Sequence, residues 1–405
     1  MRSAVVRRVQ QLLDAACAAA DETGVELWVV GGALRDSVAG RPVRDVDLAI
    51  ASHDPDTAAR VAQSVVDRCG DGEVTAEPRF GTATVSVEAA RIEIATLRTE
   101  EYARPGALPE VRFGASIVAD LPRRDFSVNA IALALTGPRR SELLDPCGGL
   151  DDLAARRLRA LHARSFADDA TRLWRGARYA AALDLRPEPA TARWIADGAR
   201  WLRPISGARL WAEWERTASQ RRVGRTLGLL EQWGVLRGVD EAWSVPEAAR
   251  RALRHRPGPH SPDLLLAVLL AALPARDAIA ARLTAPRTAR TAVDDAARLF
   301  AVPDASPESL ALVEDTGPDG RLAARWLDPE RQASVQRALR RWERTRPPLD
   351  ATALRRLGVP AGPALGAWLR RLRRERYLGT LGSAAAARGL VRSEPAVGDG
   401  DRESR

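Results

Sequence analysis

The stretch VVGGALRDSVAGRPVRDVDLAI, residues 29–50, decides the fold of this chain. It predicts an apolar strand over 26–31, a Gly-Gly turn with a short helix, and a second strand over 45–51. Side chains alternate between the two faces of a strand, so Asp45 and Asp47 on the second strand point to the same face. Two convergent carboxylates bind a hard cation such as Mg²⁺, and that cation in turn binds phosphates.

The turn inside this stretch and a later acidic residue support the same hypothesis. Gly31 and Gly32 let the backbone approach a phosphate, because they carry no Cβ. Glu93 lies on a predicted strand, in RIEIATLR (91–98), and could complete a triad with the two aspartates. Taken singly, these features have plain alternatives: a simple turn, a solvated Asp pair, and a solvent-facing glutamate on an edge strand. Their order and short spacing favour a nucleotidyl-transfer site.

The composition limits the class of protein. A chain of 405 residues with 45% hydrophobic residues can bury a core and suggests two or more domains. It has no uninterrupted apolar run of ~18 residues, so no membrane span is expected, and its amphipathic first residues do not resemble a signal peptide. Cys17, Cys69 and Cys147 are far apart and show neither zinc-binding nor disulfide spacing. We therefore expect a cytoplasmic protein with reduced cysteines.

The charge suggests a polyanionic partner. The formal net charge is +9, and all 62 basic residues are arginine, because the chain contains no lysine. Arginine binds phosphate through two parallel hydrogen bonds and stacks on bases. GC-rich coding would also explain the absence of lysine, but the net positive balance still points to a partner such as a nucleic acid.

The pattern of residues 1–150 predicts a mixed α/β domain. Helices are expected near 4–22 and 55–69, and the alternation over 80–98 predicts a hairpin of two strands. The segment 99–122 is rich in proline and glycine and is expected to be a long loop, a kind of segment that is usually functional or mobile. FSVNAIALAL (126–135) is expected to form a helix, followed by a short strand at SELLDP.

From about residue 151 onward the strand signal nearly vanishes. Ala, Leu, Arg and Trp recur at helical spacing, which predicts roughly ten short helices separated by Pro and Gly. The whole chain is therefore expected to have an α+β fold class, with a small mixed sheet followed by helices. We expect these boundaries: a catalytic head at 1–150, a neck at 151–220, a body at 221–300, a tail at 301–390, and a disordered end at 391–405.

The motif RRDFSVNA (123–130) is a second candidate site. Arg124 precedes the predicted helix, Asp125 stands where an N-cap carboxylate would, and Asn129 falls one turn later on the same face. Such a cluster can bind phosphate and donate or accept hydrogen bonds with a ribose. Capping alone would explain Asp125, but it would not explain the pair of arginines or Asn129.

The segment FADDATRLWRGARYAAALDL (166–185) could read a base. Asp168 or Asp169 is expected to start a helix, and Arg172 lies three residues after Asp169, so acceptor and donors can project together. Cytosine and adenine each present an amino donor beside a ring-nitrogen acceptor, whereas guanine and uracil present the reverse pattern. The alternative is a capping carboxylate with a helix salt bridge, which contributes only tenths of a kcal/mol.

Taken in order, these motifs resemble the class II tRNA nucleotidyltransferase and bacterial poly(A) polymerase family. GGALRD with RDVD resembles the first family motif, RRDFSVNA the second, and DPCGGLDDL (145–153) the third, which we expect to form a hinge. DDATRLWRGARY resembles the nucleotide-selecting helix, and ARLWAEWERTA (208–218) the motif that follows it. The selecting motif usually begins Glu-Asp, whereas this chain has Asp168-Asp169, and no His-Asp phosphohydrolase pair is present.

The resemblance implies a polymerase-β-like head and an all-helical neck, body and tail. It implies two-metal nucleotidyl transfer to the 3′ end of tRNA from CTP and ATP without a template, with Asp45 and Asp47 holding Mg²⁺ and Glu93 as a third catalytic carboxylate. The implied nucleotide-binding residues are Gly31, Gly32, Arg35, Arg124, Asp125, Asn129, Asp168, Asp169, Arg172, Arg175 and Arg178. The candidates for RNA binding in the tail are Arg370, Arg371, Arg373, Arg374 and Arg376, which a solvated helix face would explain equally well.

We expect CCA addition or repair, with several rivals. The family's CC-only enzymes shorten the flexible element after the third carboxylate, and the segment 99–122 looks full-length here. This does not separate CCA addition from A-only addition or from a poly(A) polymerase. An RNA-binding protein without catalysis is disfavoured by the intact Asp45 and Asp47. A nucleotidyltransferase acting on a protein or an antibiotic is disfavoured by the long basic helical region.

Overall fold

The computed structural model describes residues 2–43, 45–87 and 90–393. Within these residues, seven strands form one sheet in the order β3-β4-β5-β2-β1-β8-β9. Strands β2 and β5 pair in parallel, and every other pair of neighbours is antiparallel. The bounds are β1 (Leu27–Val30), β2 (Asp45–Ile50), β3 (Glu73–Glu77), β4 (Thr82–Val87), β5 (Ala90–Thr96), β8 (Ala132–Ala134) and β9 (Leu143–Leu144).

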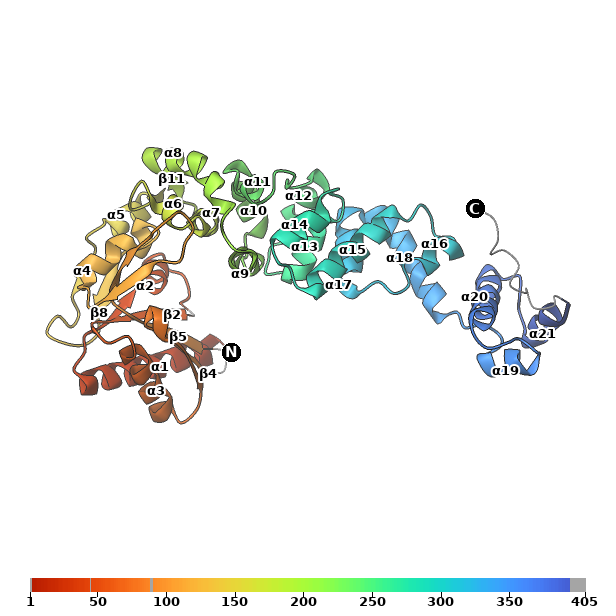
Figure 1. The fold of residues 1–405 in the computed structure, drawn as a ribbon, viewed down its shortest axis with the longest axis horizontal. Coiled ribbons are helices and arrows are strands. Elements are labelled where there is room, and N and C mark those ends of the chain that lie inside the picture. Colours follow the sequence, from red (N-terminus) through yellow and green to blue (C-terminus); the bar gives the residue numbers. More distant parts are fainter. Residues whose placement is uncertain (1, 44, 88–89, 394–405) are drawn as a thin grey trace. The chain divides into compact units, whose positions relative to one another are not determined.

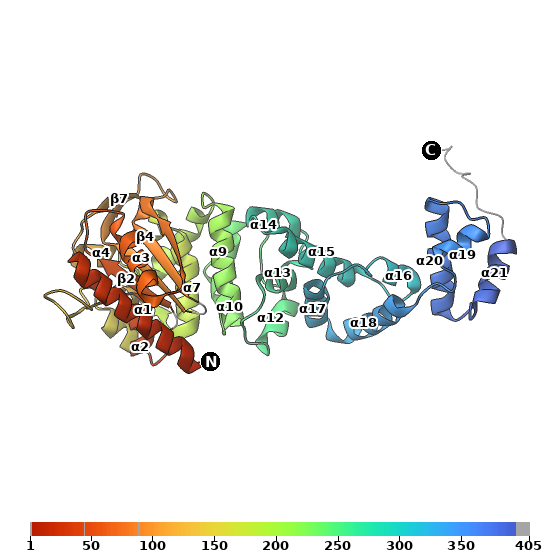
Figure 2. The ribbon, with the colours of Figure 1, turned by 90° about the horizontal axis from the view of Figure 1, so that it is seen from below.

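Two helices cover one face of this sheet. Helices α1 (Arg2–Thr23) and α3 (Thr57–Cys69) lie below the strands in Figure 1, and Figure 2 shows α1 in front of them. The side chains of Leu48, Ile92 and Ile94 point toward these helices and are fully buried in the core between the layers. Because side chains alternate along a strand, the residues next to these apolar ones, Asp47 and Glu93, project from the opposite face. The alternation thus directs the acidic side chains away from the helical layer.

Two sequence predictions for the head are wrong in their local structure. The segment 99–122 contains a hairpin of β6 (Arg98–Glu101) and β7 (Glu110–Phe113), and then α4 (Ile117–Asp120). The expected helix over 126–135 is instead a single 3₁₀ turn, η3 (Ser127–Asn129), followed by β8. Strand β8 pairs with β1 inside the sheet and is covered on both sides. It therefore has the continuous apolar sequence that cannot be told from a buried helix by periodicity.

The helical predictions after residue 150 are confirmed in kind, although the helices of the described residues outnumber the ten expected. The chain divides into two compact units, the first comprising Met1–Val245, Pro257–Pro259 and Ala281–Thr284, and the second comprising the remainder. The finer division into neck, body and tail stays a prediction. Of the end expected to be disordered, 391–393 belong to α21 (Ala384–Ser393), and 394–405 lie outside the described residues.

The helices of the first unit that matter for the site follow the sheet directly. They are α2 (Gly32–Val38), α5 (Gly149–Ala154), α6 (Ser165–Asp168), α7 (Thr171–Leu183), α8 (Pro189–Gly198), α9 (Gly207–Ala218), α10 (Val223–Gln232) and α11 (Val235–Val239). Helix α7 packs closely on the sheet domain, because Gly176 lies against the buried ring of Phe126. Phe126 also meets Tyr179 of α7 edge to face at 6.0 Å between ring centroids.

The second unit is built from helices alone within its described residues. Their bounds are α12 (Glu247–Arg254), α13 (Pro262–Leu270), α15 (Arg287–Ala301), α16 (Pro307–Ala311), α17 (Pro318–Leu327), α18 (Pro329–Arg344), α19 (Ala351–Arg356), α20 (Pro363–Leu378) and α21, while α14 (Arg276–Arg282) spans the boundary between the units. Helix α13 is buried along its whole length from Leu264 to Leu270 and packs beside α15 and α17. None of the described helices is both long and apolar enough to cross a membrane.

The close packing of α7 on the sheet domain can be tested with a pair of glycine variants. A Cβ at position 176 would lie 2.7 Å from Cζ of Phe126, whereas a Cβ at Gly228 in α10 meets nothing within 4 Å. Gly176→Ala should therefore lower the free energy of unfolding by about 1–3 kcal/mol through overpacking. Gly228→Ala should raise it by about 0.5–1 kcal/mol, because alanine favours the helix. Urea denaturation measures both, and equal effects of the two variants would contradict this packing.

Candidate active site

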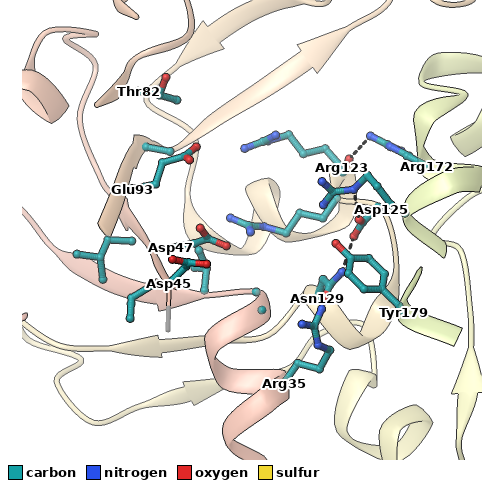
Figure 3. A pocket seen from close by; sticks show the side chains of 18 of the residues that line it. Arg35, Asp45, Asp47, Thr82, Glu93, Arg123, Asp125, Asn129, Arg172 and Tyr179 are labelled. Atoms are coloured by element: carbon teal, nitrogen blue, oxygen red, sulfur yellow. Dashed lines mark hydrogen bonds and ion pairs between the residues drawn. The ribbon is translucent and has the colours of Figure 1, made fainter. Parts of the chain in front are cut away.

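A cavity of about 890 Å³ opens between helix α7 and the face of the sheet opposite α1 and α3. Figure 3 shows Asp45, Asp47 and Glu93 on one side of this pocket and Asp125, Asn129 and Tyr179 on the other. Of the residues predicted for the site, all those in the head and at the start of α7 line the pocket except Asp168. The pocket therefore brings together motifs that are up to about 150 residues apart in the sequence.

The acidic side of the pocket follows from the pairing of β2 with β5. In this parallel register Asp47 lies directly opposite Glu93, and Asp45 opposite Arg91. Loss of solvation among the surrounding pocket residues, and then the negative charge of Glu93, raise the pKa of Asp47. Because its ionised form is destabilised, this carboxylate would be stabilised by a bound cation. Carboxylate oxygens are also the ligands that Mg²⁺ prefers. The residues present therefore fit a magnesium site.

Two carboxylates suffice for such a site. Among the described residues, no three His, Cys, Asp or Glu side chains converge closely enough to hold a metal ion. Mg²⁺ commonly keeps several waters and is bound through one or two carboxylates together with substrate phosphates. The roles of Asp45 and Asp47 as ligands, and of Glu93 as a third catalytic carboxylate, stay predictions, and Arg44 of the RDVD motif lies outside the described residues.

The Gly-Gly turn lies close to the guanidinium of Arg124 and to the carboxylate of Asp47. Gly31 has a φ of 69°, which favours glycine, and its N–H donates to the carbonyl of Ile131 at 3.1 Å. A Cβ at Gly31 would lie 3.5 Å from Nη1 of Arg124 and 3.7 Å from Oδ2 of Asp47. The Gly31 N–H is thus already used within the protein, and the Arg124 guanidinium lies on the same side of this turn as the Asp47 carboxylate.

A chain of buried hydrogen bonds forms the opposite wall. Nη1 of Arg35 donates to Oδ1 of Asn129 at 2.6 Å, and Nδ2 of Asn129 donates to Oδ1 of Asp125 at 2.9 Å. Nε of Arg175 donates to Oδ2 of Asp125 at 2.8 Å. Burial opposes the charge of Asp125, but Arg175 and Asn129 outweigh it and lower the pKa of this carboxyl to about 2. Asp125 and Asn129 meet as predicted, although a 3₁₀ turn and not a helix brings them together.

Tyr179 is a residue of this wall that sequence reasoning missed. Its ring lies 4.7 Å from the guanidinium carbon of Arg35 and 5.7 Å from that of Arg175, both measured to the ring centroid. Such cation–π contacts hold both arginines in place. The signal was present in the sequence, since Tyr179 follows Arg175 by one helical turn in WRGARY.

The candidate base-reading residues are held by separate partners. Oδ1 of Asp169 accepts from Oγ1 of Thr171 at 2.7 Å and from Nη2 of Arg209 at 2.7 Å. Nη1 of Arg172 donates to Oγ of Ser165 at 3.0 Å, and its Nη2 donates to the carbonyl of Arg123 at 2.8 Å. Both side chains line the pocket, and the structure gives no ion pair between them in the part of the chain that it describes. Arg209, in the motif after the selecting helix, was not foreseen.

The prediction that Asp168 or Asp169 starts a helix needs correction. Asp168 is the last residue of α6, and α7 begins only at Thr171, with Asp169 between the two helices. The carboxylate of Asp168 lies 3.4 Å from Arg164 and is absent from the pocket lining. The reason is that consecutive residues at a helix end diverge in direction, so only one of the two acids can face the pocket.

Arg178 reaches the pocket but is bound within the protein. It is 5% exposed and forms an ion pair with Glu213 of α9, which is 3% exposed and also accepts from Arg216 at 2.8 Å. Burial lowers the pKa of Arg178, with Glu213 acting in the opposite direction. A buried carboxylate without this partner would be strongly unfavourable. Glu213, which sequence reasoning missed, thus ties α7 to α9.

Another missed residue, Asp120, anchors the arginines of the second motif. Its side chain is 1% exposed and accepts from Nη2 of Arg123 at 2.6 Å and from Nη2 of Arg124 at 2.9 Å. It also accepts from the backbone N–H of Arg98 at 3.2 Å, at the start of the β6–β7 hairpin. Burial opposes its charge, but the two arginine side chains outweigh burial and lower the pKa of Asp120. Asp120 thus fixes the direction in which Arg124 enters the pocket.

The third family motif supports this wall from behind. Oγ of Ser127 donates to the buried Asp152 at 2.6 Å, and Asp145 accepts from the first N–H groups of α5, those of Gly149 and Leu150. A Cβ at Gly149 would lie 2.1 Å from the carbonyl oxygen of Ser127, so only glycine allows this approach.

The predicted tail arginines differ in their availability. Arg373 is 19% exposed at its side chain and is committed to Glu314 at 2.6 Å and to the carbonyl of Trp342 at 2.9 Å. Arg370 and Arg376 are exposed, and Arg374 is exposed beside Glu308. Arg371 lies over the ring of Trp368 at 5.1 Å. Arg373 is therefore occupied by contacts within the second unit. RNA binding stays a prediction for the other four arginines.

Comparison with known proteins adds independent support to this geometry. Residues 27–159 match the family described as the poly A polymerase head domain. Over 376 residues the chain is 32% identical to a CC-adding tRNA nucleotidyltransferase of Deinococcus radiodurans, across 91% of this chain and 89% of the relative. The chain belongs to the tRNA nucleotidyltransferase and poly(A) polymerase family.

Other members of the family differ in the nucleotides that they add. An A-adding tRNA nucleotidyltransferase of Halalkalibacterium halodurans is 41% identical over 169 residues, 42% of this chain and 38% of the relative. The solved structure of a CCA-adding enzyme in an apo form matches with a TM-score of 0.74 at 21% identity, across 96% of this chain and 98% of that one. The family, the enzyme class and the fold class predicted from the sequence are confirmed.

The Asp125 network has a pH signature. Because the folded pKa of about 2 lies below the ordinary value of 3.8, the stabilisation is fully present above pH ~4 and is lost as pH falls toward 2. The stability gap between the protein and its Asp125→Asn variant should shrink by about 1 kcal/mol between pH 6 and pH 3, and by about 2 kcal/mol by pH 2. Urea unfolding at pH 6, 4 and 3 measures it, with the exposed Asp197→Asn variant as control for the loss of one negative charge. A gap independent of pH would refute the network's contribution.

Proposed function

We propose that this protein is a tRNA nucleotidyltransferase that adds or repairs the 3′-terminal CCA of tRNA from CTP and ATP without a nucleic-acid template. The observation that carries the proposal is that Asp169 and Arg172 face the same pocket as Asp45 and Asp47. A pair that can read a base and a pair that can hold a metal thus share one cavity. The three cysteines are free, which fits a reaction in the reducing cytoplasm.

The residues of the pocket divide the work of nucleotidyl transfer. Asp45 and Asp47 would hold Mg²⁺, which when bound activates the tRNA 3′-hydroxyl and neutralises the leaving pyrophosphate. Arg124 would bind the triphosphate, since it lines the pocket beside Gly31 and Asp120 holds its guanidinium. The hydrogen-bonded residues Arg35, Asn129 and Asp125 would donate hydrogen bonds to the ribose hydroxyls and accept hydrogen bonds from them.

Base choice would rest on the fixed positions of two groups. The Asp169 carboxylate would accept from the exocyclic amino group of cytosine or adenine, and the Arg172 guanidinium would donate to the neighbouring ring nitrogen. Guanine and uracil present a ring N–H where Arg172 needs an acceptor and a carbonyl where Asp169 needs a donor. Their binding would leave these groups unpaired and is therefore disfavoured. Separate partners hold the two residues, and this arrangement keeps their spacing constant as the base changes.

The β6–β7 hairpin supports addition of all three nucleotides. It is complete, and its tip reaches the selecting region, because the N–H of Gly106 donates to the carbonyl of Ala167 at 3.2 Å. The family's CC-only enzymes shorten this element. A relative that matches over most of the chain is nevertheless a CC-adding enzyme, so CC addition is the second candidate.

One assay separates these activities. The purified protein is incubated with tRNAs that end at the discriminator base, at C and at CC, with each labelled nucleoside triphosphate singly. Ordered addition of C, C and A that then stops supports the proposal. Addition that stops at CC would assign a CC-adding enzyme, addition only to tRNA-CC an A-adding one, and long A tails on arbitrary RNA a poly(A) polymerase. No incorporation in the presence of Mg²⁺ would overturn the enzymatic proposal.

The metal assignment has its own test. Asp45→Ala should reduce incorporation by about 10³-fold or more, because a ligand of the ion that stabilises charge in the transition state is lost. Binding of tRNA, measured by filter binding, should change by less than twofold. As a control, Asp54→Ala removes an exposed carboxylate of the same unit outside the pocket and should leave incorporation unchanged. Activity retained in the Asp45 variant would remove this residue from the metal site.

A further inference from the structure

A second cavity, of about 690 Å³, lies in the first unit and shares no lining residue with the active-site pocket. It forms where β10 (Arg157–Leu158) pairs in parallel with β11 (Arg186–Pro187). The charged residues of its lining are four arginines, Arg156, Arg157, Arg186 and Arg225, and two acids, Asp184 and Glu188. We refer to it as the arginine cavity.

The two acids of the arginine cavity are already occupied. Oδ2 of Asp184 accepts from Arg222 at 2.8 Å, and its other oxygen accepts from Arg225. Glu188 caps helix α8 and accepts from the N–H of Thr191 at 3.0 Å. Neither acid therefore neutralises the arginines of the paired strands.

The arginines at the paired strands carry more positive charge than the nearby acids neutralise. Arg157 lies 3.3 Å from the buried Asp152, which Arg159 shares at 2.6 Å. Arg156 and Arg186 are exposed, and the described residues offer no ion pair to either of them. The backbone forces them together, because the N–H of Arg186 donates to the carbonyl of Arg156 at 2.9 Å. Two exposed guanidinium groups at adjacent positions can both donate to one anion, and such charge-assisted hydrogen bonds are stronger than neutral ones.

The backbone at the cavity is strained at two charged residues. Arg156 has a φ of 52° after the end of α5, and Asp184 has a φ of 59° at the end of α7. Glycine normally fills such left-handed positions, and a residue with a Cβ there costs about 1–2 kcal/mol. Among the described residues, four that are not glycine have a positive φ, and two of them line this cavity. Strain of this kind concentrates at functional sites.

We propose that the arginine cavity binds the phosphodiester backbone of the RNA substrate; this rests on the proposed function. Its described lining contains no aromatic side chain on which a base could stack, so the recognised group is phosphate. Arginine forks match phosphate oxygens bidentately. Helix α7 runs from Arg172 to Asp184, about 18 Å at ~1.5 Å per residue. That length corresponds to about five stacked nucleotides at ~3.4 Å each, which places the contact upstream of the reacting 3′ end.

The test uses a double variant that preserves the backbone. Arg156→Gly suits the left-handed conformation, so Arg156→Gly with Arg186→Ala removes two charges without adding strain. The dissociation constant for tRNA is measured by filter binding at several KCl concentrations. Losing two phosphate contacts should lower the slope of log Kd against log salt by about 1.4–1.8. The matched control, Arg193→Ala with Arg237→Ala, removes two exposed arginines of the same unit outside the cavity and should keep the slope.

Two further measurements separate this proposal from its rivals. The KM for CTP at saturating tRNA should be unchanged in the double variant, because the nucleotide pocket shares no residue with the cavity. An unchanged salt slope would overturn the proposal. If that slope is unchanged while inorganic pyrophosphate raises the melting temperature of the wild type but not of the variant, the cavity binds a small free anion and the RNA assignment is wrong. Failure of the wild type to extend tRNA would count against the proposed function and not against this contact.

Discussion

The ion pair between the buried carboxylate of Asp125 and the partly exposed guanidinium of Arg175 is the interaction on which the site depends. It joins the sheet domain to helix α7 at 2.8 Å, and the adjacent Phe126 packs on Gly176 and Tyr179 of the same helix. One end of α7 is thereby held against the face of the sheet that carries the acidic residues. With the contacts of Arg172 to the Arg123 carbonyl and of Tyr179 to Arg35, the ion pair places the groups that could read a base and the groups that could hold a metal in one pocket.

The sequence predicted the acidic side of the pocket well. Alternation along a strand is a short-range property, so the common face of Asp45 and Asp47 followed from the sequence alone. Glu93 could be placed beside them because its neighbours Ile92 and Ile94 identified the buried face of its strand. In the structure Glu93 stands directly opposite Asp47.

The other side of the pocket was predicted less completely, for physical reasons. The segment 126–135 was expected to be a helix, because a strand covered on both sides has the same apolar sequence as a buried helix. Arg209 and Glu213 act through partners on another segment of the chain, Asp169 and Arg178, and no local pattern announces such contacts. Asp120 lies three and four residues before Arg123 and Arg124, so its spacing was visible in the sequence, but its burial was not. Asp168 and Asp169 are neighbours of the same type, so only the structure could show that the first faces Arg164 and the second the pocket.

The shared carboxylate of Asp120 has a consequence for how such an enzyme can change. It binds Arg124, which lines the pocket, and Arg123, whose carbonyl accepts from Arg172. The residue proposed to bind the triphosphate and the residue proposed to read the base are therefore both positioned through the carboxylate of Asp120. A mutation that shifted this carboxylate to accept a new base would also shift the phosphates. A change of nucleotide preference is therefore expected at positions away from Asp120, where one side chain can move without moving both Arg123 and Arg124.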